Sequence, residues 1–255
     1  MAVENEAVVG FATAQLRWYG GENDQGRIWV GVDARQRQRG IGAELWQACS
    51  THLEGATRVT VEVDDDPAGL RFVGKRGFTE YGSEVMSRLI PEECVLEPKP
   101  HEGYHVLPLG AVRDREQDLF EFYAASGGVR PGDPQNQVTF EEWRDVILES
   151  PMLDDDGSVI VVDSNDRIVS MSWLLVDRAR RRAMSEWTAT LPQLRSHGLA
   201  RLAKLAAIRW AAAHNLVELV TGNEPDNLHM LELNRALGYR KVCIRRDLEL
   251  RLDEG

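Results

Sequence analysis

The residues with the clearest chemical potential form a short turn, Arg195-Ser196-His197-Gly198-Leu199-Ala200, between two very different segments. The segment before it is rich in threonine and tryptophan and favours a strand, and the Ala/Leu/Arg-rich segment after it favours a helix. A strand that turns directly into a helix leaves backbone N–H groups unpaired at the positive end of the helix dipole. The turn therefore predicts a site for an anion, best suited to a phosphate or diphosphate.

A second copy of this pattern lies near the start of the chain, in Arg37-Gln38-Arg39-Gly40-Ile41-Gly42. Downstream of the two turns, Gly77-Phe78 and Gly238-Tyr239 follow at nearly equal spacing. Upstream, residues 3–11 resemble residues 162–171. Three matches in the same order predict two related units in tandem.

The repeated spacing Arg-x-x-Gly-x-Ala/Gly resembles the coenzyme A loop of the GCN5-related N-acetyltransferases, the GNAT superfamily. The family pattern is Gln/Arg-x-x-Gly-x-Gly/Ala. The resemblance covers almost the whole chain and implies that acetyl-CoA is the cofactor, with its diphosphate held by the residues of either turn. Ser196 departs from the glycine that the family often has there, but donation by backbone amides survives that change.

The resemblance also implies an α/β (α+β) fold, with a mixed central sheet flanked by helices. Residues 104–255 carry the complete element order of a GNAT unit. Residues 1–90 form a partial GNAT-like unit, because there is no room for the two helices expected before the strand at Val8. Whether this unit is degenerate or the chain start lies upstream stays open. Pro91–Gly103 is rich in proline and glutamate and is expected to be a linker.

Acetyl transfer to an amine needs a base, because an ammonium group is not a nucleophile. By resemblance, the acetyl group lies where the strands Met184–Leu191 and Leu216–Thr221 are parallel neighbours that splay apart. Glu186, on the first of these strands, is the expected base. The alternative is that Glu186 faces solvent on an alternating strand. In the first unit the aligned position is Ile28, which cannot accept a proton, so the second unit is expected to be catalytic.

Other roles are carried over from the family by position. The backbone amides near Thr188 and Thr190 would donate to the oxyanion. The tyrosine that protonates the leaving thiolate in many members falls on Asn234, which could bond the sulfur or a bridging water but is a poor acid; in the first unit it falls on Val73. Asn227 matches an asparagine that touches the cofactor, although capping of the helix that follows explains it equally well.

Composition bounds these expectations. The chain has 255 residues, of which 43% are hydrophobic and 28% charged, and its net charge of −11 disfavours nucleic acid and acidic membranes. The same charge is compatible with a cationic amine, or with solubility alone. Three scattered cysteines fit a reducing cytoplasm without disulfides. We expect no metal site, secretory signal or membrane span.

The sequence thus predicts an acetyl-CoA-dependent N-acetyltransferase that acts on a primary amine of a small molecule or peptide, with Glu186 as general base. The loop Gly127–Val138 is expected to line the acceptor pocket. The alternative is a non-catalytic acyl-CoA-binding or sensor protein. A dinucleotide-binding fold fails because the chain has no suitable G-x-G-x-x-G after a strand. The oligomeric state, a homodimer included, stays open.

Overall fold

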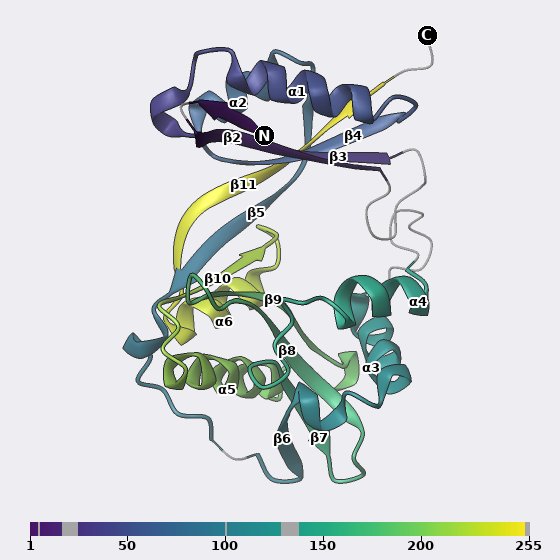
Figure 1. Cartoon of the computed structure of the whole chain (residues 1–255). Coiled ribbons are helices and arrows are strands. Elements are labelled where there is room, and N and C mark those ends of the chain that lie inside the picture. The colour runs from purple at the N-terminus through teal and green to yellow at the C-terminus, as the bar shows by residue number, and fades with distance from the viewer. Residues whose placement is uncertain (5, 17–24, 100, 129–137, 253–255) are drawn as a thin grey trace. The chain divides into compact units, whose positions relative to one another are not determined.

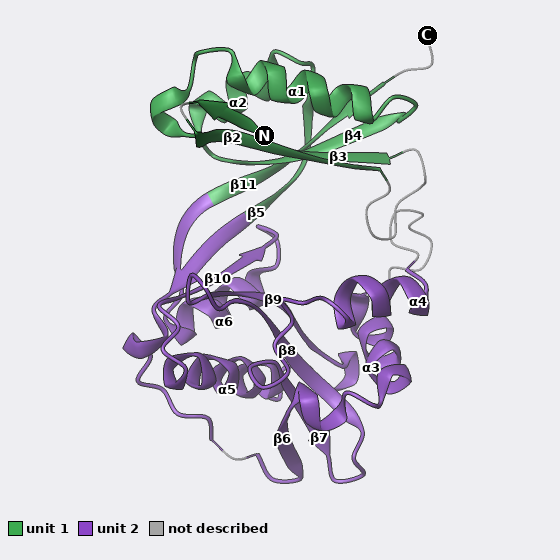
Figure 2. Cartoon of the chain, in the orientation of Figure 1, with its two compact units in different colours: residues 1–84, 244–255 green, residues 85–243 purple. Residues whose placement is uncertain are grey.

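The computed structural model describes residues 1–4, 6–16, 25–99, 101–128 and 138–252. Its internal contacts divide the chain into two compact units (Figure 2). Unit 1 comprises residues 1–84 and 244–255, and unit 2 comprises residues 85–243. The units are therefore not consecutive in the sequence, because the chain returns to unit 1 at its end.

Unit 1 is a sheet with the strand order β1-β2-β3-β4-β11, followed by the first part of β5. Its β3–β4 pair is parallel, whereas β1–β2, β2–β3 and β4–β11 are antiparallel. Helices α1 and α2 lie on the same side of these strands (Figure 1). The elements are β1 (Ala2–Glu4), β2 (Ala7–Leu16), β3 (Gln25–Val32), α1 (Ile41–His52), β4 (Arg58–Asp64) and α2 (Pro67–Gly74).

The core of unit 1 lies between this sheet and its two helices. Ile28 of β3, Leu53 at the end of α1, Val61 of β4 and Val73 of α2 belong to one buried cluster. In the described part of unit 1 no helix comes before β2, as the sequence predicts. Trp29 on β3 is consequently 45% exposed.

Unit 2 is a sheet with the order β10-β9-β8-β7-β6, to which the second part of β5 is added beside β10. The β9–β10 pair is parallel, and the other pairs are antiparallel, so the predicted mixed sheet is confirmed. The elements are β6 (Tyr104–Pro108), α3 (Glu116–Tyr123), α4 (Phe140–Trp143), β7 (Val159–Asp163), β8 (Ile168–Asp177), β9 (Arg182–Thr190), α5 (Leu199–Ala213), β10 (Glu218–Asn223) and α6 (Leu228–Leu237).

Local sequence explains where the helices begin and end. The Asp66 carboxylate accepts from the Gly69 N–H at 3.0 Å at the start of α2, and Pro67 occupies the first helical position. Thr139 and Glu142 form a capping box before α4. Helix α6 starts at the cap Asn227 and stops at Gly238, which is left-handed. These caps agree with the predicted helix boundaries.

The last strands of the two halves are exchanged. Strand β5 (Thr79–Leu89) follows α2, yet its residues 85–89 pair with β10 of unit 2. Strand β11 (Arg240–Arg251) follows α6, yet its residues 245–251 pair with β4 of unit 1. The division predicted at residues 90 and 104 thus differs from the compact units. An alternating pattern predicts a strand but does not specify its neighbour, so the sequence could not show this exchange.

Candidate functional site

The two predicted anion-binding turns have the same backbone conformation. Gln38 and Ser196, at the second position of the motif, have φ values of 63° and 66°. Gly40 and Gly198, at the fourth position, have φ values of 89° and 81° and directly precede α1 and α5. A left-handed φ is unfavourable for residues other than glycine, so an L side chain at either glycine would strain the turn.

The backbone amides of both turns are available for a ligand. Within the described residues, the N–H groups of residues 38–42 and of residues 196–200 donate to no protein acceptor. They lie at the N-termini of helices of 12 and 15 residues, where the helix dipole adds to their attraction for an anion. Each turn can therefore bind a phosphate group through its backbone.

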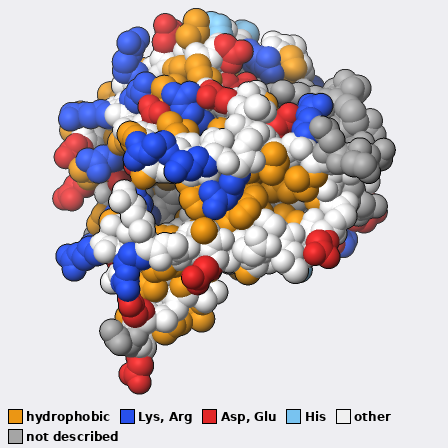
Figure 3. Space-filling view, turned by 90° about the horizontal axis from the view of Figure 1, so that it is seen from above, with side chains coloured by type: hydrophobic (Ala, Val, Ile, Leu, Met, Phe, Trp, Pro, Cys, Tyr) orange, Lys and Arg blue, Asp and Glu red, His pale blue; other side chains and the backbone are white. Residues whose placement is uncertain are grey.

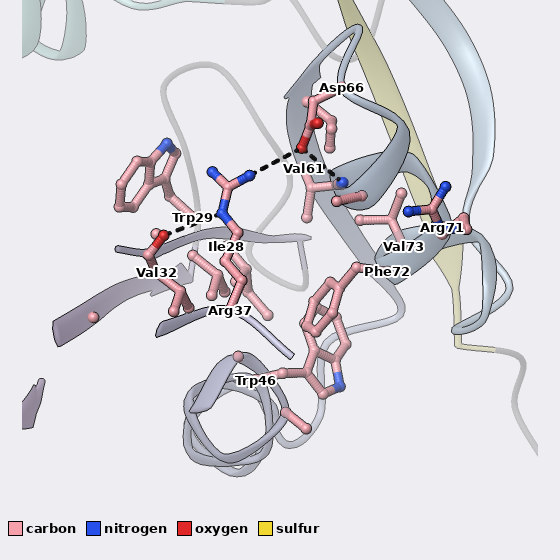
Figure 4. Close-up of a pocket in the computed structure, with 18 of the residues that line it drawn as sticks. Ile28, Trp29, Val32, Arg37, Trp46, Val61, Asp66, Arg71, Phe72 and Val73 are labelled. Atoms are coloured by element: carbon pink, nitrogen blue, oxygen red, sulfur yellow. Dashed lines mark hydrogen bonds and ion pairs between the residues drawn. The ribbon is translucent and has the colours of Figure 1, made fainter. Parts of the chain in front are cut away.

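The first arginine of each motif braces the turn against the preceding strand. Arg37 Nε donates to the Val32 carbonyl at 3.3 Å, and Arg195 Nε donates to the Thr190 carbonyl at 3.4 Å. Arg37 also pairs with Asp66 at 3.5 Å, across the mouth of a cavity (Figure 4). The guanidinium groups thus hold the turn in place and leave the amides to contact a ligand.

The other predicted loop side chains have mostly structural contacts. Arg39 donates to the Glu4 carboxylate at 2.8 Å, and this hydrogen bond lowers the pKa of Glu4. The His197 ring bonds the Arg195 carbonyl at 2.9 Å. Leu199 is 1% exposed and anchors α5 in the core. Ile41, Gly42 and Ala200 are half-buried in the first turns of their helices.

The parallel strands separate at the same point in both units. The β9–β10 ladder ends at the pair Met184 and Val220. The β3–β4 ladder ends at the equivalent pair, Arg27 and Thr60. The strands predicted to splay are therefore parallel neighbours whose regular pairing ends at the third of the nine residues of β9.

A bulge distinguishes β9 from its counterpart β3. On β8, Ser172 faces Thr188 and Leu174 faces Ser185, so Trp173 alone faces both Glu186 and Trp187. The β2–β3 ladder has no such shift. Bulges turn a side chain out of the regular register and are common beside active sites. Glu186 is exposed at this bulge.

The bulge corrects one alignment made from the sequence. Counting from the turns places Ile28 opposite Glu186, but β9 contains one additional residue. Ile28 and Ser185 each follow the last ladder pair, and they are 2% and 3% exposed. Ile28 therefore corresponds to Ser185, and Glu186 is the inserted residue without a counterpart in unit 1.

The two predicted threonines use their side chains inside the sheet. Thr188 Oγ1 bonds Ser172 Oγ at 3.1 Å, and Thr190 Oγ1 bonds Ser170 Oγ at 2.8 Å. These contacts tie β9 to β8 beyond the bulge. Only the backbone groups of the threonines remain for the role predicted for them.

Four buried polar residues surround the point where β9 and β10 part. Thr221 Oγ1 donates to the Ser185 carbonyl at 3.0 Å, and Lys204 Nζ from α5 donates to Ser185 Oγ at 3.1 Å. Asn234 Nδ2 from α6 donates to Asn223 Oδ1 at 2.6 Å, while Asn234 Oδ1 is buried without a hydrogen-bond partner among the described residues. All four are at most 3% exposed. We call Ser185, Lys204, Thr221 and Asn234 the polar floor.

The polar floor includes residues that the sequence reasoning missed. Burial lowers the pKa of Lys204 to about 7. One sequence signal could have indicated its burial. Lys204 lies between the apolar residues Leu202, Ala203 and Leu205, which are all buried in α5. Ser185 gave no such signal, because its place depends on where the ladder ends.

In unit 1 the corresponding positions are apolar and surround an open cavity of about 1130 Å³. These positions are Ile28, Trp46, Val61 and Val73, drawn with the cavity in Figure 4. The Arg37–Gly42 turn lies at its edge, together with Arg71, Lys75 and Arg76 of α2 and the residues that follow it. Figure 3 shows Lys and Arg side chains gathered beside apolar ones on the face seen from above.

Asn227 and Asp66 both act as helix caps. Asn227 Oδ1 accepts from the Met230 N–H at 3.3 Å. The Gly69 N–H bonded to Asp66 lowers the pKa of that carboxyl. The capping explanation of Asn227 is thus confirmed, and its contact with a cofactor stays a prediction.

The linker brings a further residue to the turn of unit 2. His101 Nε2 lies 3.0 Å from the position that a Cβ on Gly198 would occupy. Arg209 of α5 holds the linker by donating to the Cys94 carbonyl at 2.8 Å and by pairing with Glu97. No pattern in the sequence indicates this contact. Most of the predicted acceptor loop, residues 129–137, lies outside the described part of the chain.

Family models match both halves of the chain. Residues 1–78 match the model described as acetyltransferase (GNAT) family, and residues 107–226 match the acetyltransferase (GNAT) domain. The chain is therefore a member of the GNAT superfamily with two tandem units. Comparison of the sequence with curated proteins gives no match.

Solved structures share this fold. One is a GCN5-related N-acetyltransferase from Sphaerobacter thermophilus, with a TM-score of 0.73, 16% identity, and coverage of 97% of this chain and 78% of that one. Another is a tandem GNAT protein from the clavulanic acid biosynthesis pathway, with a TM-score of 0.69, 18% identity, and coverage of 91% and 76%. A third is a GCN5-related N-acetyltransferase from Kribbella flavida, with a TM-score of 0.60, 15% identity, and coverage of 98% and 89%.

The helices of the structure were also compared with the length and hydropathy that a bilayer requires. Among the described residues, none is both long and apolar enough to span a membrane.

Proposed function

We propose that the chain is an acetyl-CoA-dependent N-acetyltransferase whose reaction takes place in unit 2. The observation that carries this proposal is the pair of α-helix N-termini with free amides, the second of which lies at the end of a bulged strand. Membership of the GNAT superfamily supplies the class of reaction. The acceptor is a primary amine of a small molecule or peptide.

The residues present in unit 2 fit the coenzyme. The amides of residues 196–200 would bind the diphosphate, since no protein group competes for them. The buried Asn234 Oδ1 lacks a partner, and it would accept a hydrogen bond from the pantetheine arm or the thiol. Bound there, the coenzyme supplies an acetyl thioester that an amine can attack.

Glu186 is the base in this proposal. Glu186 lies in the bulge, two residues beyond the last β9–β10 ladder pair, and it is exposed. A carboxylate there can take a proton from the acceptor ammonium, directly or through water. Unit 1 has no residue inserted at this position, so its ladder offers no equivalent base.

Unit 1 supports a second, non-catalytic role in coenzyme binding. Its turn, residues 37–42, has the same conformation and equally free amides, and it borders a cavity of about 1130 Å³. The cavity floor is apolar, so it can hold a ligand but offers no proton donor. If unit 2 were equally inert, the whole chain would be an acyl-CoA-binding or sensor protein.

The test is release of coenzyme A from acetyl-CoA in the presence of a panel of primary amines. We expect at least one amine to raise the rate, and Glu186→Gln to lower kcat by about 10²-fold or more while leaving the KM for acetyl-CoA unchanged. Glu62→Gln, which changes a carboxylate at the cavity of unit 1, is the matched control and should keep full activity. Binding of acetyl-CoA without release for any amine would favour the sensor function instead.

A further inference from the structure

The polar floor contains a lysine that no step described so far requires. Lys204 is 2% exposed, and among the described residues its one hydrogen bond, to Ser185 Oγ, is 3.1 Å long. An ammonium group with so little compensation is costly to bury, and a buried hydrophobic residue of similar size would cost nothing comparable. Groups with strongly perturbed pKa values cluster at functional sites. Lys204 is therefore a candidate functional residue.

We propose that Lys204 is the proton source for the leaving thiolate and acts through the hydroxyl of Ser185. The inference rests on the proposed function. It assigns the general acid that protonates the thiolate, a role for which the side-chain amide of Asn234 is too weak an acid. Ser185 is the first residue of β9 beyond the last ladder pair, so its side chain lies where the strands begin to part. Lys204 itself is a positioning residue, because it reaches the gap only through Ser185.

Among the described residues, no charged partner of Lys204 would hold it protonated. Burial is the cause of its low pKa, which at about 7 allows it to lose and regain a proton near neutral pH. The Tyr239 ring lies 5.1 Å from Nζ, and burial raises the pKa of its hydroxyl, which therefore stays neutral. The Cys94 thiol, from the linker, lies near Tyr239. Thr221 of β10 contributes a neutral hydroxyl on the far side of Ser185.

The corresponding positions of unit 1 lie beside a space large enough for a ligand. Trp46 takes the place of Lys204 on α1, and Ile28 takes the place of Ser185 on β3. Both line the open cavity beneath the turn of unit 1. The equivalent positions of unit 2 therefore lie on the path that the thioester arm would follow, and there they carry an amine and a hydroxyl.

The proton transfers balance without another reactant. As the amine bonds to the acetyl carbon, the electron pair of the breaking carbon–sulfur bond stays on sulfur. Ser185 Oγ gives its proton to that sulfur and takes one from Lys204 Nζ. Glu186 takes the first proton from the acceptor ammonium and passes it to water before the attack. It then takes the second proton, which the nitrogen loses after it bonds to carbon, and Lys204 regains its proton from solvent.

The experiment is a spectrophotometric titration of the coenzyme A thiol in its complex with the full chain, compared between wild type and Lys204→Met. Below pH 7 Lys204 is still an ammonium, and a nearby ammonium favours the thiolate. The fraction of bound thiol present as thiolate at pH 6–7 should therefore be about tenfold larger in wild type than in Lys204→Met. Because Lys204 belongs to unit 2, coenzyme bound in unit 1 contributes equally to both titrations. Lys241→Met, at an exposed lysine of β11, is the control and should match wild type.

Turnover gives an independent readout. Lys204→Met and Ser185→Ala should each lower kcat by about 10²-fold, and the double variant should lose no more than either alone. Lys204→Met should also unfold at a temperature no lower than wild type, which separates the proposed role from a structural one. Equal thiolate fractions at pH 6–7 in wild type and Lys204→Met would overturn the proposal for Lys204 alone. Failure of coenzyme A to bind would overturn the proposed function itself.

Discussion

Units 1 and 2 share the same strand pair and turn, but they differ in the strand bulge and in the side chains at the point where the strands separate. Each has a parallel strand pair whose ladder ends after three residues, and a left-handed glycine that starts the following helix. In unit 2 the strand is bulged and the floor of the gap is polar. In unit 1 the strand is regular and the floor is apolar. In the proposed function, the shared turns bind the anionic part of the coenzyme, and the bulge and polar floor of unit 2 carry out the chemistry.

The comparison also shows which features follow from the family and which belong to one unit. The arginine brace, the free amides and the capped second helix recur in both units. Glu186, Ser185, Lys204 and Asn234 occur only in unit 2. One catalytic unit and one binding unit would explain this difference most directly. Exchanging residues between the two units tests that explanation.

The largest expected effect comes from replacing the left-handed glycine of one turn at a time. Gly198→Val places a branched side chain at a φ of 81°, where His101 already lies against the glycine. Strain of about 1–3 kcal/mol should raise the KM for acetyl-CoA about 10- to 100-fold. Gly40→Val imposes the same strain on unit 1 and should leave kcat/KM within about twofold, because its turn serves no reaction. Steady-state kinetics of both variants decide the matter; a greater loss from Gly40→Val would place the reaction in unit 1.

An exchange of the floor residues on the second helix should have an intermediate effect. Asn234→Val copies unit 1 into unit 2, and loss of one hydrogen bond to the ligand should lower kcat about tenfold. Val73→Asn copies unit 2 into unit 1, where a buried amide without partners should cost about 1–3 kcal/mol of stability. Val73→Asn should nevertheless retain its kcat. Urea unfolding and turnover of the two variants, measured side by side, test the exchange. Unchanged kcat in Asn234→Val would remove that residue from the site.

The last expected effect concerns stability rather than turnover, and it is a dependence on pH. Burial lowers the pKa of Lys204 from 10.5 to about 7, so between these values the unfolded chain binds more protons than the folded one. The stability of wild type should therefore rise with pH over this window relative to Lys204→Met. Thermal unfolding of the two proteins from pH 7 to pH 10 measures the difference. A gap between their unfolding temperatures that stays constant over that range would mean that Lys204 does not titrate in the folded protein.

Much of the fold could be predicted from local sequence. The strands, the helix caps at Asp66, Thr139 and Asn227, and the repeated turns each depend on a few neighbouring residues. The anion-binding role of the turns followed from the same short patterns. Local signals of this kind are reliable because they report contacts made within a few positions.

The remaining features depend on contacts between distant segments. The exchange of β5 and β11 depends on which strand lies beside β4 and β10, and an alternating pattern is silent on that choice. The bulge at Glu186 appears only when β9 is paired with β8, and it is why Ile28 aligned with the wrong residue. Lys204 was hidden because helical lysines are mostly exposed, and its burial becomes visible only when α5 packs against β9.

Amide hydrogen exchange, read at the two turns with and without acetyl-CoA, tests the central claim most directly. Acetyl-CoA should slow exchange at residues 196–200, and Gly198→Val should need about 10- to 100-fold more acetyl-CoA for the same protection, in step with its higher KM. Exchange at residues 196–200 that is unchanged by saturating acetyl-CoA, in a chain that still transfers acetyl groups, would contradict that claim.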